Sequence, residues 1–300
     1  MTYTAREFTP EATRSVLDAA CWAADLDPEG ASLMRLGENA LYRLASAPVV
    51  VRIARTMDYW SNVVKEVAVA RWLAGAGFPA AHLATPLDQP LEACGHPVTF
   101  WEFISGEVAM PEDVGLLGDT LRKLHELPPP REFELPAVDI LARIQPRVAS
   151  APVSADDKAL LLNRCDELRD AISELRFPLH ECAIHGDAHI KNLMIVTGKP
   201  IILDFENFAW GHPEWDLSMT ATEYVTARWW SDEQYRRFSD AYGYDIRDWD
   251  GFPVLRATHE IKMTTWIMQN VNNSPEIRAE YEARMRTIRD GDITATWRPF

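Results

Sequence analysis

Residues 185–192 read HGDAHIKN, and residues 201–206 read IILDFE. In these two stretches, two aspartates and an asparagine accompany short apolar runs that are typical of strands. Asn192 follows Asp187 by five residues, and Asp204 follows Asn192 by twelve. A carboxylate placed directly after a buried strand is costly unless it is paired or bound to a metal. The spacing therefore indicates a functional cluster rather than three unrelated turn residues.

These three side chains have the chemistry that phosphoryl transfer needs. The reaction needs a carboxylate for the proton of the attacking hydroxyl and oxygen ligands that hold Mg²⁺ against the nucleotide phosphates. Mg²⁺ prefers oxygen donors such as carboxylates and amides. The spacing also matches the protein-kinase motifs H-R-D-x-x-x-x-N and D-F-G, with Gly186 for Arg and Glu206 for Gly. We therefore predict Asp187 as the catalytic base and Asn192 and Asp204 as magnesium ligands.

The run H-G-D-x-H-x-x-N, followed by apolar-D-x-E, resembles the aminoglycoside phosphotransferase and choline kinase superfamily. Residues 211–217, which read GHPEWDL, are similar to the G-x-P-x-x-D-L segment of that family. The resemblance extends over residues from about 30 to 290. It implies an α+β, bilobal protein-kinase-like fold, with a small antiparallel-sheet N-terminal lobe and a larger, mainly helical C-terminal lobe.

Local patterns agree with two lobes that meet near residue 105. Clusters of β-branched residues bounded by Gly and Pro predict strands within residues 31–54 and at 98–104. Apolar periodicity predicts helices at 10–26, 60–76, 114–126, 154–176, 217–243, 253–272 and 275–290. We therefore expect residues 1–104 to form a nucleotide-binding lobe with a hinge at 102–104. Residues 105–300 are expected to contain the catalytic loop, the metal site and the acceptor site.

The resemblance implies a phosphate-binding pair in the first lobe. Arg52 lies in VVRI, where protein kinases have V-A-I-K, and Glu66 would be its partner on the following helix. Arginine is always charged and binds oxyanions in a bidentate manner, so it suits this role. The alternative is an exposed strand arginine and a solvated helix glutamate. Gly37 and Asn39, in the run LGENAL, would form a nucleotide loop, or simply a hairpin turn.

Further contacts with the nucleotide are implied at the hinge. Backbone groups of Glu102 and Ile104 would hydrogen-bond the purine edge of ATP or GTP, although an ordinary core strand has the same sequence pattern. The donor nucleotide cannot be chosen from these residues, because backbone groups make the contact.

Two histidines flank the predicted base. The resemblance implies that His185 is buried and hydrogen-bonded behind the loop, and that His189 supports the loop near the substrate. The pattern His-x-Asp-x-His is also compatible with a zinc hydrolase, but no further His or Cys cluster completes such a site. Lys191 replaces a glycine that is common in the family, and its positive charge would lie near the phosphates or the substrate.

Three acidic residues have secondary roles in this prediction. Asp216 would anchor the catalytic loop by accepting its backbone N–H groups, or would cap a helix. Glu206 would contact a second Mg²⁺ or the substrate, or would be structural. Glu260 is a candidate for binding an ammonium group of the acceptor.

Composition limits the class of partner. The net charge is −15, which argues against nucleic acid, because that binding depends on neutralisation of phosphates by Lys and Arg. This charge is compatible with a cationic acceptor, although it also promotes solubility. No apolar run reaches the ~18–20 residues of a membrane span, and residues 1–7 lack a signal-peptide pattern, so we expect a cytoplasmic protein. The four cysteines have no C-x-x-C spacing and are expected to be buried free thiols.

The combined prediction is a Mg²⁺-dependent phosphotransferase that moves the γ-phosphate of ATP or GTP to a hydroxyl of a small molecule. An aminoglycoside or another hydroxylated antibiotic is the first candidate acceptor. A kinase of an endogenous metabolite, such as choline, a sugar or an amino alcohol, is the alternative. A nucleotide-binding pseudokinase is a third reading, against which the intact Asp187, Asn192 and Asp204 count.

Overall fold

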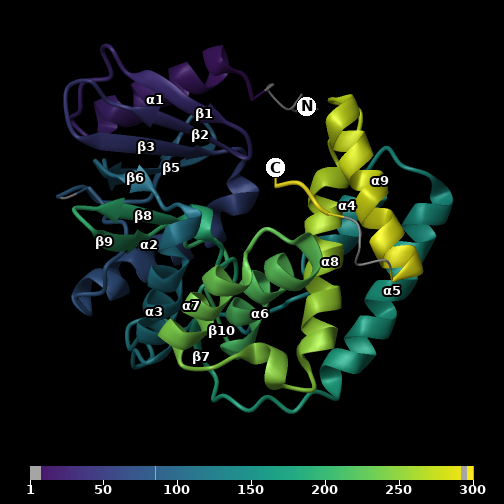
Figure 1. Ribbon diagram of the computed structural model, residues 1–300. Coiled ribbons are helices and arrows are strands. Elements are labelled where there is room, and N and C mark those ends of the chain that lie inside the picture. The colour runs from purple at the N-terminus through teal and green to yellow at the C-terminus, as the bar shows by residue number, and fades with distance from the viewer. Residues whose placement is uncertain (1–7, 85, 292–295, 300) are drawn as a thin grey trace. The chain divides into compact units, whose positions relative to one another are not determined.

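The computed structural model describes residues 8–84, 86–291 and 296–299. Residues 1–7, on which the expectation of no signal peptide depends, lie outside the described residues. Contacts along the chain define two compact units (Figure 1). The first consists of Met1–Val108, Pro130–Phe133 and Met194–Glu206, and the second of Ala109–Pro129, Glu134–Leu193 and Asn207–Phe300.

The first unit extends beyond the boundary predicted at residue 104. It includes residues 194–206, which the sequence places in the second lobe. The reason is strand pairing, since β8 (Leu193–Val196) pairs antiparallel with β6 (Glu107–Val108) and β9 (Lys199–Ile202) pairs with β8.

A five-stranded antiparallel sheet forms the centre of the first unit, in the order β1-β2-β3-β5-β4. Its strands are β1 (Ser32–Leu36), β2 (Asn39–Arg43), β3 (Val49–Ala54), β4 (Leu91–Ala93) and β5 (His96–Glu102). The strands predicted within 31–54 and at 98–104 are therefore confirmed, although β5 begins and ends two residues earlier than predicted.

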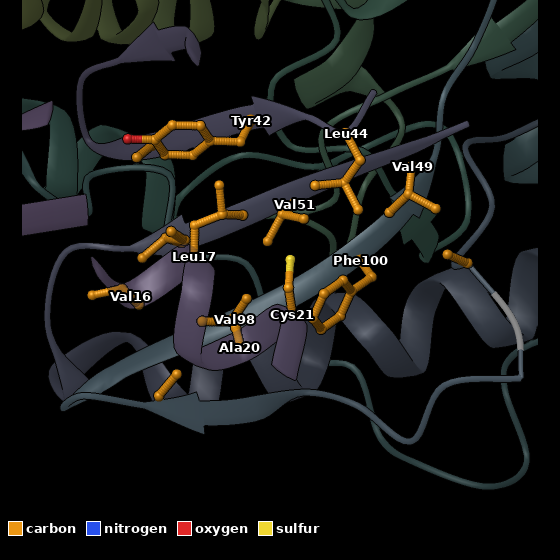
Figure 2. Packing of buried hydrophobic residues seen from close by; sticks show 14 residues of the cluster. Val16, Leu17, Ala20, Cys21, Tyr42, Leu44, Val49, Val51, Val98 and Phe100 are labelled. Atoms are coloured by element: carbon orange, nitrogen blue, oxygen red, sulfur yellow. The ribbon is translucent and has the colours of Figure 1, made fainter. Parts of the chain in front are cut away.

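One face of this sheet packs on α1 (Pro10–Ala23). Thr9 caps the helix by accepting a hydrogen bond from the backbone N–H of Ala12 at 3.3 Å, and Pro10 occupies the first turn, as helix starts favour. Figure 2 shows the resulting core, in which helix side chains meet strand side chains. Its labelled members are Val16, Leu17, Ala20, Cys21, Tyr42, Leu44, Val49, Val51, Val98 and Phe100.

The alternation of β3 places Arg52 on the face opposite this core. Val51 and Ile53 are fully buried, whereas Arg52 between them is only partly buried. Side chains of successive strand residues point to opposite faces of a sheet. Arg52 consequently reaches α2 (Trp60–Gly75), which contributes the buried Glu66.

The second unit is mainly helical. It contains α3 (Val114–His125), α4 (Ile144–Ser150), α5 (Ala155–Ser173), α6 (Glu214–Thr222), α7 (Asp232–Tyr242), α8 (Phe252–Met268) and α9 (Pro275–Asp290), with β7 (Cys182–Ile184) paired antiparallel to β10 (Ala209–Gly211). α8 packs against α4, α5, α6 and α9 (Figure 1). The predicted fold class, a small antiparallel sheet followed by a mainly helical part, is confirmed.

The helix predicted over 217–243 is wrong as a single element. α6 begins earlier, at Glu214, and continues into a π-helical segment, Glu223–Ala227. Arg228 then adopts a left-handed conformation with φ of 62°, which ends the helix. Ser231 starts α7 with a capping box to Gln234. The short helix α4 was not predicted.

Two further expectations concern cysteines and membranes. Cys21, Cys165 and Cys182 are buried free thiols, as predicted, but Cys94 is exposed, because it lies in the tight turn between β4 and β5 with φ of 52°. Among the helices of the described residues, none combines the length and apolarity needed to cross a bilayer.

Candidate active site

Asp216, at the start of α6, holds the backbone of the loop that follows β7. Its two carboxylate oxygens accept hydrogen bonds from the backbone N–H of His185 at 2.7 Å and of Gly186 at 2.8 Å. His125 Nε2 lies 3.0 Å from Asp216 Oδ2. Burial alone would raise the pKa of Asp216, but the hydrogen bonds and charges of the histidines outweigh it and lower that pKa. The ionised Asp216 therefore fixes the loop immediately before Asp187.

Side chains on the same loop define where Asp187 lies. The backbone N–H of Asp187 donates to Nδ1 of the fully buried His185 at 3.3 Å. Asn192 Nδ2 donates to the carbonyl of Asp187 at 3.0 Å, which leaves the amide oxygen of Asn192 as its possible ligand atom. His189 Nε2 lies 3.7 Å from Asp187 Oδ2. The carboxylate of Asp187 is half-buried, so a small molecule has access to it.

Gly186 is required by both its conformation and its neighbours. Its φ is +80°, and a Cβ at this position would lie 2.2 Å from the backbone oxygen of Asn207. We expect Gly186→Ala to lower the free energy of unfolding by about 2–4 kcal/mol, from left-handed strain and backbone displacement together. Chemical denaturation measures this change.

Gly243 provides the matched control. Its φ is +91°, but a Cβ there would meet nothing within 4 Å. Gly243→Ala should therefore lose only the strain contribution, about 1 kcal/mol. Equal losses in the two variants would show that the contact with Asn207 does not constrain the loop.

A second cluster lies in the first unit around Arg52. Its guanidinium forms an ion pair with Glu66 and lies 3.4 Å from Glu206 Oε2. With its amide oxygen turned toward the guanidinium, Asn39 accepts from Arg52 Nη2 at 3.0 Å and from Nε at 3.3 Å. Lys65 Nζ donates to the carbonyl of Glu206 at 2.5 Å. The predicted pairing of Arg52 with Glu66 is present, and Glu206 joins it.

This cluster carries more negative than positive charge. Burial disfavours the charged form of Arg52, but Glu66, Asp204 and Glu206 together raise its pKa. Burial also raises the pKa of Glu66 to about 7, with Arg52 opposing the rise and Glu206 and Asp204 adding to it. The other two carboxylates contribute to both shifts, because three carboxylates share a single guanidinium. A further cation would relieve this imbalance, which fits a divalent metal.

The raised pKa of Glu66 makes stability depend on pH. An unfolded glutamate has a pKa near 4.5 and folded Glu66 one of about 7, so the folded state binds the extra proton between these values. Its contribution to stability is therefore present at low pH and is lost as pH rises through 7. We expect Glu66→Gln to reduce the loss of unfolding free energy between about pH 5 and pH 8 by roughly 2 kcal/mol. Identical pH profiles of the variant and the parent would contradict this origin.

Asp204 has the backbone conformation of a constrained residue. Its φ is +61°, a region that a non-glycine side chain rarely adopts, and such strain concentrates at functional sites. Its Oδ1 accepts from the backbone N–H of Glu206 at 3.4 Å. Asn192 directly precedes β8 and Asp204 follows β9 by two residues, so the hairpin of these two strands connects the predicted ligands along the chain. An amide oxygen and a carboxylate are suitable donors for Mg²⁺, which normally keeps several waters or phosphate oxygens.

The described residues contain no group of three or more His, Cys, Asp or Glu side chains arranged to hold a metal ion. Mg²⁺ held by two side chains and nucleotide phosphates does not need such a group. For the zinc alternative, Nδ1 of His185 already accepts a hydrogen bond from the loop backbone. The fully buried ring of His185 therefore stabilises the loop backbone and is not exposed to bind zinc.

The backbone groups predicted to contact the nucleotide differ in whether they already have hydrogen-bond partners within the protein. The backbone N–H of Glu102 donates to the carbonyl of His82 at 2.9 Å, so only the carbonyl of Glu102 remains for a purine, and the contact of Ile104 stays a prediction. Gly37 lies in the turn between β1 and β2, where its N–H donates to the carbonyl of Asn39 at 3.0 Å. A Cβ at Gly37 would meet only Arg35 Nε at 3.8 Å, so nothing steric requires glycine there.

Glu260 is satisfied inside the protein. Its Oε1 accepts from Thr226 Oγ1 at 2.6 Å and lies 3.4 Å from Arg256 Nε. Burial raises its pKa. The carboxylate of Glu260 thus has hydrogen-bonding and charged partners within the protein, and it does not need an ammonium group of the acceptor as a partner.

Sequence reasoning missed several residues around the loop. His125 supports Asp216 from α3, and no motif marks it. Glu223 is buried in the π-helical segment, where Trp230 Nε1 donates to it at 2.9 Å. Burial raises its pKa to about 7, and Asp187 adds to the rise. A cavity of about 660 Å³ beside α7, lined by residues such as Tyr224, Asp240 and Tyr244, contains no predicted site residue.

Comparisons with known proteins identify the family and the fold. Residues 36–255 match the APH family, described as the phosphotransferase enzyme family. A search of curated proteins finds no match. The fold is similar to that of amicoumacin kinase hAmiN, solved with AMP-PNP, Ca²⁺ and Ami, with a TM-score of 0.75 and 16% identity over 99% of this chain and 98% of that one.

Two other solved structures share the fold. A choline/ethanolamine kinase family protein from Mesorhizobium loti aligns with a TM-score of 0.63 and 20% identity, over 93% of each chain. Aminoglycoside phosphotransferase APH(3'')-Id from Streptomyces rimosus aligns with a TM-score of 0.59 and 18% identity, over 83% of this chain and 97% of that one. At these identities the likeness shows the fold.

Proposed function

Because the chain belongs to the APH phosphotransferase enzyme family, and is thus a small-molecule kinase, we propose that it transfers the γ-phosphate of ATP or GTP to an acceptor hydroxyl. The observation that carries this proposal is the loop after β7. Asp216 holds the backbone of His185 and Gly186, and the loop presents the half-buried carboxylate of Asp187.

Asp187 orients the acceptor hydroxyl and takes its proton. The hydroxyl oxygen forms a bond to the γ-phosphorus, and the bond from that phosphorus to the β–γ bridging oxygen breaks. The nucleoside diphosphate leaves with that electron pair. Positioning of this kind supplies most of the rate enhancement in phosphoryl transfer. The hydrogen bond from Asn192 to the carbonyl of Asp187 supports that positioning.

Arg52 binds the α/β-phosphates, and Glu66 and Asn39 orient its guanidinium. Asn192 and Asp204 hold Mg²⁺, and Glu206 is auxiliary through its contact with Arg52. When bound, Mg²⁺ neutralises phosphate charge. The nucleotide and divalent ion in the amicoumacin kinase structure support both cofactors.

An aminoglycoside or another hydroxylated antibiotic is the first candidate acceptor, which the likeness to amicoumacin kinase and APH(3'')-Id supports. A metabolite is the second candidate, because the choline/ethanolamine kinase family protein also shares the fold, over 93% of each chain.

The test is diphosphate release from Mg²⁺-ATP and Mg²⁺-GTP in the presence of hydroxylated antibiotics, choline, amino alcohols, sugars and hydroxy acids. We expect at least one acceptor to stimulate release strongly above the rate with water alone. Binding of the nucleotide without stimulation by any acceptor would favour the pseudokinase reading. Failure to bind either nucleotide would contradict the kinase function.

A further inference from the structure

Lys262, on α8, has an unusual position for a lysine. It is half-buried on a helix that packs against four others, and its Nζ lies 5.0 Å from the centroid of the Trp215 ring. Within the part of the chain that the structure describes, its ammonium group forms no hydrogen bond or ion pair, and the Trp215 ring is its neighbour. Burial lowers the pKa of Lys262 to about 8, because desolvation disfavours the charged form. Near neutral pH this ammonium group is still mostly charged, and a bound anion would stabilise its charged form.

The same site contains two arginines from α4. Arg147 lies on the helix and Arg143 immediately precedes it, one helical turn away, and both are half-buried. Their charges lower the pKa of Lys262 further, so both arginines lie close enough to Lys262 to repel its ammonium group. Arg143 is held in a left-handed conformation with φ of 65°. α4 packs directly on α8, which keeps the three residues together.

The negative charges near Lys262 belong to Asp187 and Asp139, and Asp187 has the larger effect. Asp187 is the proposed base for the acceptor hydroxyl. Geometry agrees, because Trp215, the ring next to Lys262, donates its Nε1–H to the carbonyl of Gly186, the residue before Asp187, at 3.2 Å. Lys262 therefore lies near the place where the acceptor would react, and all these residues belong to the second unit. The protein as a whole has a net charge of −15, but net charge does not show where on the molecule the positive and negative side chains lie.

We propose that Lys262, together with Arg143 and Arg147, binds an anionic group of the acceptor, a carboxylate or a phosphate, while the acceptor hydroxyl meets Asp187. This inference rests on the proposed function and names its substrate class as hydroxylated anions. An anion would pair with the ammonium group of Lys262 and offset its repulsion by the two arginines. Arginine guanidinium groups suit both anions, because they bind carboxylate and phosphate oxygens in pairs. The expectation of a cationic acceptor depended on the net charge and on Glu260, which bonds to Thr226 inside the protein.

Another role for Lys262 would be to stabilise the transferring phosphoryl group. In that case its removal would slow the reaction of every acceptor equally. An acceptor site instead distinguishes a charged acceptor from its neutral isostere. The experiments below use this difference.

Binding is tested first, without turnover. The chain has six lysines, which makes ¹³C NMR of methylated lysines simple to assign: Lys65, Lys123, Lys158, Lys191, Lys199 and Lys262. The Lys262→Met variant identifies the Lys262 signal. We expect glycolate or glycerol 3-phosphate to raise the pKa of Lys262 by about one unit, a tenfold shift in its proton affinity. Glycolamide and glycerol, which are neutral, should leave it unchanged, and comparison of glycolate with glycerol 3-phosphate distinguishes carboxylate from phosphate.

No shift with either anion at about 50 mM, or an equal shift with the neutral compounds, would overturn the proposal. A shift with choline alone would overturn it in favour of a cationic acceptor. This measurement does not depend on catalysis, so it remains decisive even if the protein proves to have no phosphotransferase activity.

Kinetics provide the second test. We expect Lys262→Met to raise KM for an anionic acceptor at least tenfold, with kcat and the nucleotide KM nearly unchanged, and Lys262→Arg to retain most of the affinity. Lys123→Met is the matched control, since Lys123 is an exposed lysine on α3 in the same unit. An equal loss of kcat for anionic and neutral acceptors would assign Lys262 to the phosphoryl group and overturn the acceptor site.

Discussion

Replacement of Asp187 by Asn is expected to lower acceptor-dependent kcat by about 10²–10⁴-fold, the usual contribution of a positioned general base. The amide keeps the size and most hydrogen-bonding capacity of the carboxylate but does not accept the hydroxyl proton. Affinity for the nucleotide should change little, because the hydrogen bonds of Asp216 to the loop backbone remain. Single-turnover kinetics with a saturating acceptor measure the effect directly.

The control for this change is Asp166→Asn on α5. Asp166 is 66% exposed and pairs with Arg169 of the same helix. The control variant should keep the parental kcat. If Asp187→Asn also kept it, the proton of the acceptor would be transferred elsewhere, and the role of the loop would have to be abandoned.

Replacement of Asp204 by Asn should lower kcat by about 10²–10³-fold, comparable to the loss of one preorganised charge-stabilising group. The variant loses a negative ligand for Mg²⁺, so the Mg²⁺ concentration that gives half-maximal rate should also rise. The same change removes one of three carboxylates around Arg52, which should bring the raised pKa of Glu66 closer to its ordinary value. Titration of the rate with Mg²⁺ separates the metal effect from a general loss of activity.

Asp88→Asn is the matched control in the first unit, because Asp88 is exposed. Glu206→Gln is the informative comparison, since Glu206 contacts Arg52 and should affect the nucleotide KM more than the Mg²⁺ requirement. A parental Mg²⁺ dependence in Asp204→Asn would exclude this residue as a metal ligand.

Short-range patterns predicted much of the molecule. The alternation of β3 placed Arg52 opposite the core, and apolar spacing on α2 left Glu66 able to meet it. Motif spacing identified the loop at 185–192, and the structure places Asp216 against its backbone. These features are local, or depend on a motif whose spacing has a chemical reason.

Features that depend on distant contacts were not predictable in this way. The break at Arg228 depends on a left-handed residue that no propensity marks. The role of His125 depends on the packing of α3 beside α7, which is so close that a Cβ at Gly118 would lie 2.4 Å from the oxygen of Phe238. Lys262 shares α8 with Arg256 and Glu260, so nothing in the sequence marks it as different from an ordinary charged residue of a helix.

Charge illustrates the same limit. The net charge of −15 favoured a cationic acceptor, yet the groups around Lys262 include two arginines. Glu260, the predicted ammonium ligand, bonds to Thr226 inside the protein. Only the tertiary arrangement shows which charges are already compensated.

The central claim is that this chain moves a phosphoryl group from a nucleotide to a hydroxyl. ³¹P NMR of a reaction with Mg²⁺, nucleotide and the best acceptor of the panel tests it most directly. We expect one phosphomonoester of the acceptor for each nucleoside diphosphate formed, at a rate about 10²–10⁴-fold lower with Asp187→Asn. Inorganic phosphate in place of the phosphomonoester, at a rate that does not depend on the acceptor, would contradict the claim.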